Sequence, residues 1–169
     1  MIDISKVEEL KKKRELLKEK KRDEDRKNLI RDLTSFFDSK NIGYNLILDD
    51  LEDEFSSRGW VYRNYTFHLW ARINQEGLNG CCVLNINNYQ GCTEIVKDLI
   101  SKNKFSADYV YIFWTDADRP LLKVKFKDFI NYAYEIFEED WDTWVFSPEN
   151  NWCIEYHHDG ELSFIPVME

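Results

Sequence analysis

The feature that most constrains the fold is a run of eleven residues, 18–28 (KEKKRDEDRKN), without a single apolar side chain. The surrounding stretch, residues 5–39, lacks Gly and Pro and is rich in Leu, Lys, Glu and Arg, which predicts one long helix. A helix without an apolar stripe cannot be held by packing. We therefore expect residues 1–28 to form an exposed charged helix and residues 29–169 to form a single α+β domain.

The same helix is expected to dock only at its C-terminal end. A heptad pattern that starts at Val7 and Leu10 fails at Arg14, Lys21 and Glu24, so coiled-coil dimerisation is not expected. The sequence thus predicts a monomer or a weak dimer. Apolar residues resume after the charged run, and they are Leu29, Ile30, Leu33, Phe36 and Phe37.

The rest of the chain alternates between helical and extended patterns, with 43% hydrophobic residues for a single core. The predicted elements are a helix over 45–57 ended by Gly59, a strand or hairpin over 60–73, a strand over 81–87, a helix over 93–103, a central strand over 109–114, a helix over 125–139 and a strand over 143–146. This order predicts an α+β fold, with N-terminal helices followed by a largely antiparallel sheet that has helices packed on one face.

The C-terminal segment carries the clearest turn signal. Asp159-Gly160 lies between two alternating runs, which is typical of a two-residue type I′ hairpin. In that register His158 faces Glu161 and His157 faces Leu162.

Charge is distributed unevenly along the chain. The net charge is −9, and after Lys127 there are eleven carboxylates and no Lys or Arg. Such a region repels nucleic acid and membrane phosphates and attracts a basic protein surface. Acidic solubility is the alternative explanation. Interleaved aromatic residues favour a binding face, so we expect a basic protein partner, no direct nucleic-acid binding and no membrane binding.

The sequence has no apolar run of roughly 20 residues and no secretory signal, which predicts a cytoplasmic protein. No cofactor is expected, because glycine-rich phosphate loops and the HExxH and GxSxG motifs are missing.

Two groups of residues have side chains that could bind a metal or take part in catalysis. His157 and His158, with Asp159 and Glu161 nearby, are ligand types, but adjacent strand residues point to opposite faces, so no metal site is expected. Vicinal Cys81 and Cys82 lack the spacing of a metal or redox pair, and cysteine is more often a small buried hydrophobe. We therefore expect no enzymatic activity and no catalytic residues.

Residues Tyr109 to Phe164 follow a recognisable pattern: a hydrophobic strand that ends in Asp or Asn, a D-R-P-like turn, a helix, an aromatic strand that ends in Ser-Pro, and an acidic W-x-I-E-x-x-H-x-G-E hairpin. This pattern resembles that of small bacterial immunity proteins of polymorphic and contact-dependent growth-inhibition toxin systems. The resemblance implies a non-catalytic protein that binds a cognate toxin, commonly a basic nuclease, and blocks its active site.

The acidic region and the resemblance together predict an inhibitor that covers the nucleic-acid site of a basic toxin. The expected partner-binding residues are Asp116, Asp118, Glu135, Glu138, Glu139, Asp140, Trp141 and Asp142, with Trp144 and Trp152 as further aromatic candidates. A second hypothesis is a phage-encoded inhibitor of a host nucleic-acid enzyme or defence system that acts through an acidic, nucleic-acid-mimicking surface. A third is an enzyme that uses Cys81, Cys82, His157 or His158, and a fourth is a structural protein whose working part is the N-terminal helix.

Overall fold

The computed structural model describes residues 4–48, 57–68, 72–86, 91–116 and 119–167. Within them, a seven-stranded sheet has the order β1-β4-β3-β5-β6-β7-β2, and every neighbouring pair is antiparallel. The strands are β1 (Tyr44–Ile47), β2 (Cys82–Asn85), β3 (Tyr109–Trp114), β4 (Leu121–Lys125), β5 (Thr143–Ser147), β6 (Trp152–His157) and β7 (Glu161–Pro166). The predicted α+β class is confirmed. The middle strand is β5, so the prediction that residues 109–114 form the central strand is wrong by one position.

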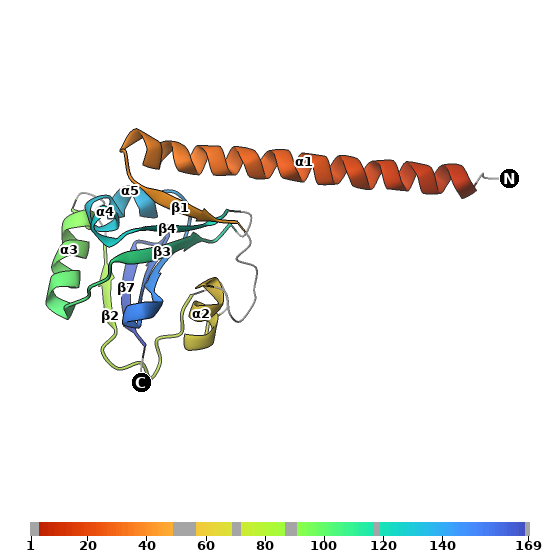
Figure 1. Cartoon of the computed structure of the whole chain (residues 1–169). Helices are drawn as coiled ribbons and strands as arrows, with labels where there is room; N and C mark the ends of the chain where they lie inside the picture. The colour runs from red at the N-terminus through yellow and green to blue at the C-terminus, as the bar shows by residue number, and fades with distance from the viewer. Residues whose placement is uncertain (1–3, 49–56, 69–71, 87–90, 117–118, 168–169) are drawn as a thin grey trace.

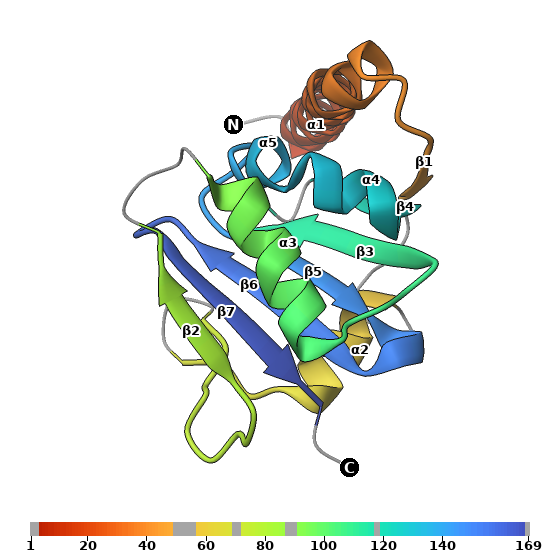
Figure 2. The same ribbon diagram turned by 90° about the vertical axis from the view of Figure 1, so that its left-hand side faces the viewer.

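The helices cover the sheet unequally. They are α1 (Ile4–Ser39), α2 (Ser57–Asn64), α3 (Cys92–Asn103), α4 (Phe126–Asn131) and α5 (Ala133–Phe137), with a short 3-10 helix η1 (Pro148–Asn150). The end of α1 and helices α3, α4 and α5 lie on one face of the sheet (Figure 2), where they pack in the larger apolar cluster. Helix α2 packs on the other face in a smaller cluster, against β3 and β5 (Figure 1).

Helix α1 follows the prediction closely. Its side chains from residue 7 to residue 28 are exposed, and it projects well beyond the sheet (Figure 1). Burial begins near Leu29 and is complete at Leu33 and Phe37, which are 1% and 0% exposed. Asn41, at a φ of 54°, adopts the left-handed conformation where the chain turns toward β1.

The segment between α1 and β2 differs most from the prediction. Tyr44–Ile47 form an edge strand paired with β4, where a helix over 45–57 was expected. Ser57–Asn64 form α2, so Gly59 lies inside a helix. Among the described residues of the expected strand over 60–73, a single antiparallel bridge remains, Phe67 to Ile73. Residues 49–56 lie outside the described part. Pairing with the distant strand β4 decided the conformation of β1, and packing in the smaller core cluster favours α2, so tertiary contacts override local propensity here.

The C-terminal half is close to the prediction, with two changes. The expected helix over 125–139 is preceded by β4 and is divided at Tyr132, whose φ of −127° is not helical. The hairpin pairs His157 with Glu161 and Tyr156 with Leu162, one residue away from the predicted register. The hairpin loop has three residues instead of the two predicted. Its third residue, Gly160, has a φ of 86°, and a three-residue loop commonly ends on such a left-handed residue.

Candidate partner-binding face

The antiparallel pairing of β5 with β6 brings two connecting segments together. Thr143 at the start of β5 lies opposite Tyr156 near the end of β6. The residues that precede β5 therefore meet the loop that follows β6. This explains how acidic residues of the α5–β5 connection come to lie beside the two histidines of the hairpin.

A shallow depression of about 520 Å³ opens at this meeting point, and we call it the Trp141 pocket. Trp141 is 69% exposed, the highest value for a large hydrophobic side chain among the described residues. Its ring centroid lies 4.9 Å from that of His158. The pocket is lined by Glu138, Glu139, Asp140, Trp141, Tyr156 and His158. An exposed aromatic ring rimmed by carboxylates is typical of a protein-binding surface.

Two of these carboxylates are held by the fold. Oε2 of Glu139 lies 3.7 Å from Nη1 of Arg119, and Oδ2 of Asp140 lies 3.9 Å from its Nε. Asp140 also accepts hydrogen bonds from the backbone N–H of Asp116 and of Trp141, at 3.0 and 2.8 Å. Burial raises the pKa of Glu139, Arg119 opposes the rise, and Asp140 adds to it. Glu138, which is exposed, carries the most accessible negative charge of the pocket rim.

The sequence predicts that Asp142 contacts a partner at the surface, whereas in the structure Asp142 is buried and only 5% exposed. Its Oδ1 accepts hydrogen bonds from the backbone N–H of His158 at 3.0 Å, and lies 2.9 Å from Nδ1 of the same residue. Its Oδ2 accepts a hydrogen bond from the Thr115 hydroxyl at 3.3 Å. The Asp142 carboxylate thus ties the hairpin loop and the end of β3 to the start of β5.

The remaining predicted residues are spread more widely. Glu135 lines a second depression, next to Glu94 and Tyr134 on the α3 side, and does not line the Trp141 pocket. Asp118 lies outside the described residues. Trp144 and Trp152 are 3% and 1% exposed, so they belong to the core and not to a binding face. Sequence reasoning missed Arg119, Tyr156 and His158 as neighbours of the pocket. The pairing of β5 with β6 brings Tyr156 and His158 there, and the pairing of β5 with β3 brings Arg119, which lies between β3 and β4.

Three of the four cysteines have the wrong environment for nucleophilic chemistry. A reactive thiol needs a lowered pKa. Burial raises the pKa of Cys81 and of Cys153, and it raises that of Cys92 to about 12.

On the face of the sheet that α2 covers, β6 carries a buried carboxylate. Glu155 is 1% exposed, and its Oε1 accepts hydrogen bonds from the Ile73 backbone N–H at 2.9 Å and from Trp144 Nε1 at 2.8 Å. Burial raises its pKa to about 7, against the opposing effects of these two donors and of Arg72. The Glu155 carboxylate is counted in the negative charge of the sequence, but it adds no acidic group to the protein surface.

The fold and the site together define a class: a small α+β protein that presents an aromatic side chain and acidic groups at one end of an antiparallel sheet. A family model described as CdiI immunity protein EcoliA0-like matches residues 47–165, more than two thirds of the sequence. The chain belongs to this family of contact-dependent growth-inhibition immunity proteins, whose role is to neutralise a cognate toxin. The match contains the Trp141 pocket and leaves out α1. No curated protein matches the chain.

The length and apolar character of the helices decide whether any of them could cross a membrane. Among the described residues, no helix combines the length and the apolar character needed to span a bilayer, and the longest, α1, is highly charged.

Proposed function

We propose that this immunity protein neutralises a basic, nuclease-type toxin by covering its nucleic-acid site with the Trp141 pocket. The observation that carries the proposal is the 69% exposure of Trp141 beside the carboxylates of Glu138, Glu139 and Asp140. A desolvated tryptophan supplies affinity at the centre of an interface, and the surrounding charge supplies the association rate.

The charge distribution supports a basic partner. A nuclease site that holds phosphates carries Lys and Arg, and it attracts a surface of opposite sign. The chain has eleven carboxylates and no cation after Lys127, and Glu138 to Asp140 belong to that region. Membership of an immunity family favours a toxin over a host nucleic-acid enzyme as the partner.

The rim residues have separate expected roles. Glu138 is exposed and free to approach a partner's cation, whereas Glu139 and Asp140 are partly compensated by Arg119. We therefore expect Glu138 to influence the association rate most and Trp141 to influence the dissociation rate most.

The test measures association and dissociation rates of the full chain on its cognate toxin domain, together with toxin neutralisation in cells. Trp141→Ala is expected to weaken binding by about 2 kcal/mol or more, mainly through faster dissociation. Glu138→Lys is expected to slow association, with an effect that shrinks at high salt.

Matched controls lie at the opposite end of the sheet. Glu149→Lys reverses an exposed carboxylate beyond the end of β5, and Tyr109→Ala removes an aromatic ring that is 41% exposed at the start of β3. Both controls should bind the toxin normally. Equal losses in the control and pocket variants, or full neutralisation by Trp141→Ala combined with Glu138→Lys, would contradict the proposal.

A further inference from the structure

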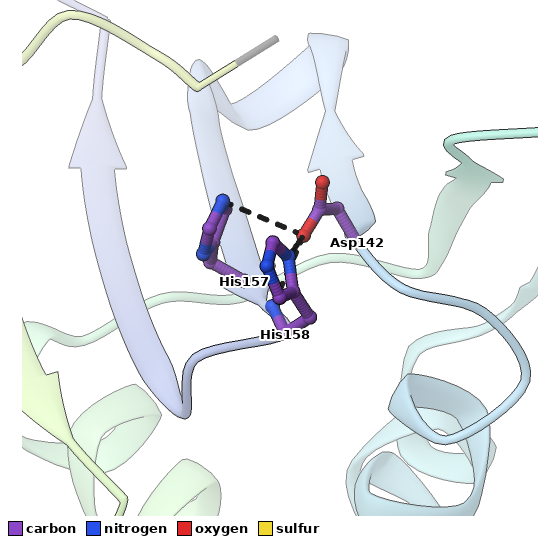
Figure 3. A group of neighbouring side chains, drawn as sticks. All are labelled: Asp142, His157 and His158. Carbon is purple, nitrogen blue, oxygen red and sulfur yellow. Dashed lines mark hydrogen bonds and ion pairs between the residues drawn. The ribbon is translucent and has the colours of Figure 1, made fainter. Parts of the chain in front are cut away.

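Three potential metal ligands converge beneath the Trp141 pocket, and we call them the Asp142 cluster: Asp142, His157 and His158. Figure 3 shows the two imidazole rings and the carboxylate turned toward one another. One ligand atom from each residue can be chosen so that all three lie within 4.8 Å of one another. The cluster draws on two segments, the residue that precedes β5 and the end of the β6–β7 hairpin.

The three-residue hairpin loop makes this convergence possible. If both histidines were in a strand, their side chains would point to opposite faces of the sheet. His157 is the last residue of β6, and His158 is the first residue of the loop, so the alternation stops between them. Their ring centroids consequently lie only 4.2 Å apart.

The spacing of the ligand atoms suits a tetrahedral metal ion. Zinc binds imidazole nitrogen and carboxylate oxygen at about 2.0–2.2 Å, which puts neighbouring ligand atoms roughly 3.3 Å apart. Oδ1 of Asp142 lies 2.9 Å from Nδ1 of His158 and 3.7 Å from Nε2 of His157. Small side-chain rotations would equalise these two distances.

Groups next to the three ligands hold the imidazole of His157 and the carboxylate of Asp142 in orientations that are common in zinc sites. A metal-binding imidazole commonly presents its second nitrogen to a carboxylate, which fixes its tautomer. Nδ1 of His157 lies 3.0 Å from Oδ1 of Asp159, which leaves Nε2 facing Asp142. The second oxygen of Asp142 is engaged by the Thr115 hydroxyl, so the carboxylate is fixed as well.

The environment is both enclosed and reachable. Asp142 is buried and the His157 side chain is 12% exposed, while the His158 side chain is 44% exposed and lines the Trp141 pocket. A bound ion would thus have three protein ligands and one position open to water from the pocket, the arrangement of an open zinc site.

We propose that Asp142, His157 and His158 form a binding site for a divalent transition-metal ion of the zinc class. The bound ion cross-links the β6–β7 hairpin to the start of β5 and fixes the floor of the Trp141 pocket. The proposal rests on the Asp142 cluster alone and does not depend on the identity of the toxin.

The test uses the full chain without toxin, titrated with Zn²⁺ by calorimetry and with Co²⁺ by visible absorption. One ion per chain is expected, with the intense visible bands of tetrahedral Co²⁺ and a rise in the thermal midpoint on adding Zn²⁺. His157→Ala and His158→Ala should each lose at least about 100-fold in affinity, and Asp159→Asn about tenfold, since it removes an orienting group only.

Two further variants keep the result interpretable. His68→Ala removes the third histidine of the chain, which is exposed and lies outside the cluster, and it should bind metal normally. Asp142→Asn keeps an acceptor for the His158 backbone N–H but loses the carboxylate ligand, so it should stay folded by circular dichroism and bind metal weakly. The absence of saturable binding to the unmodified chain, or binding that survives in the folded Asp142→Asn and His158→Ala variants, would overturn the proposal.

Discussion

Two charged regions of this protein differ in what their charges do. In the outer part of α1, residues 7–28 place basic and acidic side chains in water, and none of these side chains packs in a core. In the region from residue 128 to the end, some carboxylates line the Trp141 pocket, whereas Asp142 and Glu155 are 5% and 1% exposed. Counting charges in the sequence therefore describes the surface of the first region well and overstates the acidity of the second.

The physical reason for the difference is packing. Apolar residues follow one another in β5, β6 and β7, so both faces of these strands are buried, and polar residues within the same strands are buried with them. A buried carboxylate must find hydrogen-bond donors or take up a proton. Asp142 accepts hydrogen bonds from the His158 backbone N–H and the Thr115 hydroxyl. Glu155 accepts hydrogen bonds from Ile73 and Trp144, and its pKa is also raised.

The largest expected effect compares the same substitution in the two regions. Leu162 in β7 is 0% exposed and Leu17 in α1 is 61% exposed. Leu162→Ala should lower the free energy of unfolding by about 2–5 kcal/mol, whereas Leu17→Ala should change it by less than about 0.5 kcal/mol. Chemical denaturation measures both values. A comparable loss for Leu17→Ala would mean that the outer part of α1 packs against another surface in solution, and that its side chains are not simply exposed to water.

The next effect concerns Glu155, whose pKa is raised from its usual 4.5 to about 7 by burial. The folded protein holds this proton more tightly than the unfolded chain does. Its contribution to stability is therefore fully present below pH 4.5 and is lost as the pH rises through about 7.

Glu155→Gln keeps an oxygen acceptor for Ile73 and Trp144 and cannot ionise. At pH 8 it should raise the free energy of unfolding, on the order of 3 kcal/mol at most, and at pH 4.5 it should have little effect. Denaturation curves across this pH range measure the difference. Glu149→Gln, at an exposed position, should leave the pH profile unchanged. A Glu155→Gln profile parallel to that of the unmodified chain would refute the assignment.

A smaller effect tests the hairpin loop that distinguishes the predicted register from the observed one. Gly160 has a φ of 86°, and a Cβ there would lie 3.0 Å from the carbonyl oxygen of Ile86. Gly160→Ala should cost about 1–2 kcal/mol of unfolding free energy. Gly43→Ala is the control, since no atom lies within 4 Å of its added Cβ, and its effect should be neutral or slightly stabilising. Equal thermal midpoints for the two variants would contradict the three-residue loop.

The smallest effect is expected from removing residues 1–28, which we propose to be separate from the folding unit of residues 29–169. Deletion should change the free energy of unfolding by less than about 1 kcal/mol, because the described side chains of this segment are exposed. The net charge should pass from −9 to −12, since the segment has eleven basic and eight acidic residues. Loss of the cooperative transition in the truncated chain would show that α1 belongs to the folding unit.

The sequence by itself determined the elements whose signals are local. The composition of residues 5–39 and the absence of apolar residues from 18–28 defined both the long helix and its exposed part. The 3.6-residue periodicity of α3 and the apolar run of β3 placed those elements within one residue of their observed bounds. The resemblance of the C-terminal third to immunity proteins agrees with the family match.

Tertiary structure alone decided what depends on distant pairing. The edge strand β1 exists because β4, more than seventy residues away, offers it a partner, and α2 forms where Val61 and Tyr65 can enter the smaller core cluster. The pairing of β5 with β6 and the three-residue hairpin loop brought Tyr156, His157 and His158 beside residues 138–142, and so assembled the Trp141 pocket and the Asp142 cluster. The sequence indicated the members of each group but not that the two groups meet. A single-residue change of register reverses the face to which a strand side chain points, and local sequence preferences are too weak to fix the register to one residue.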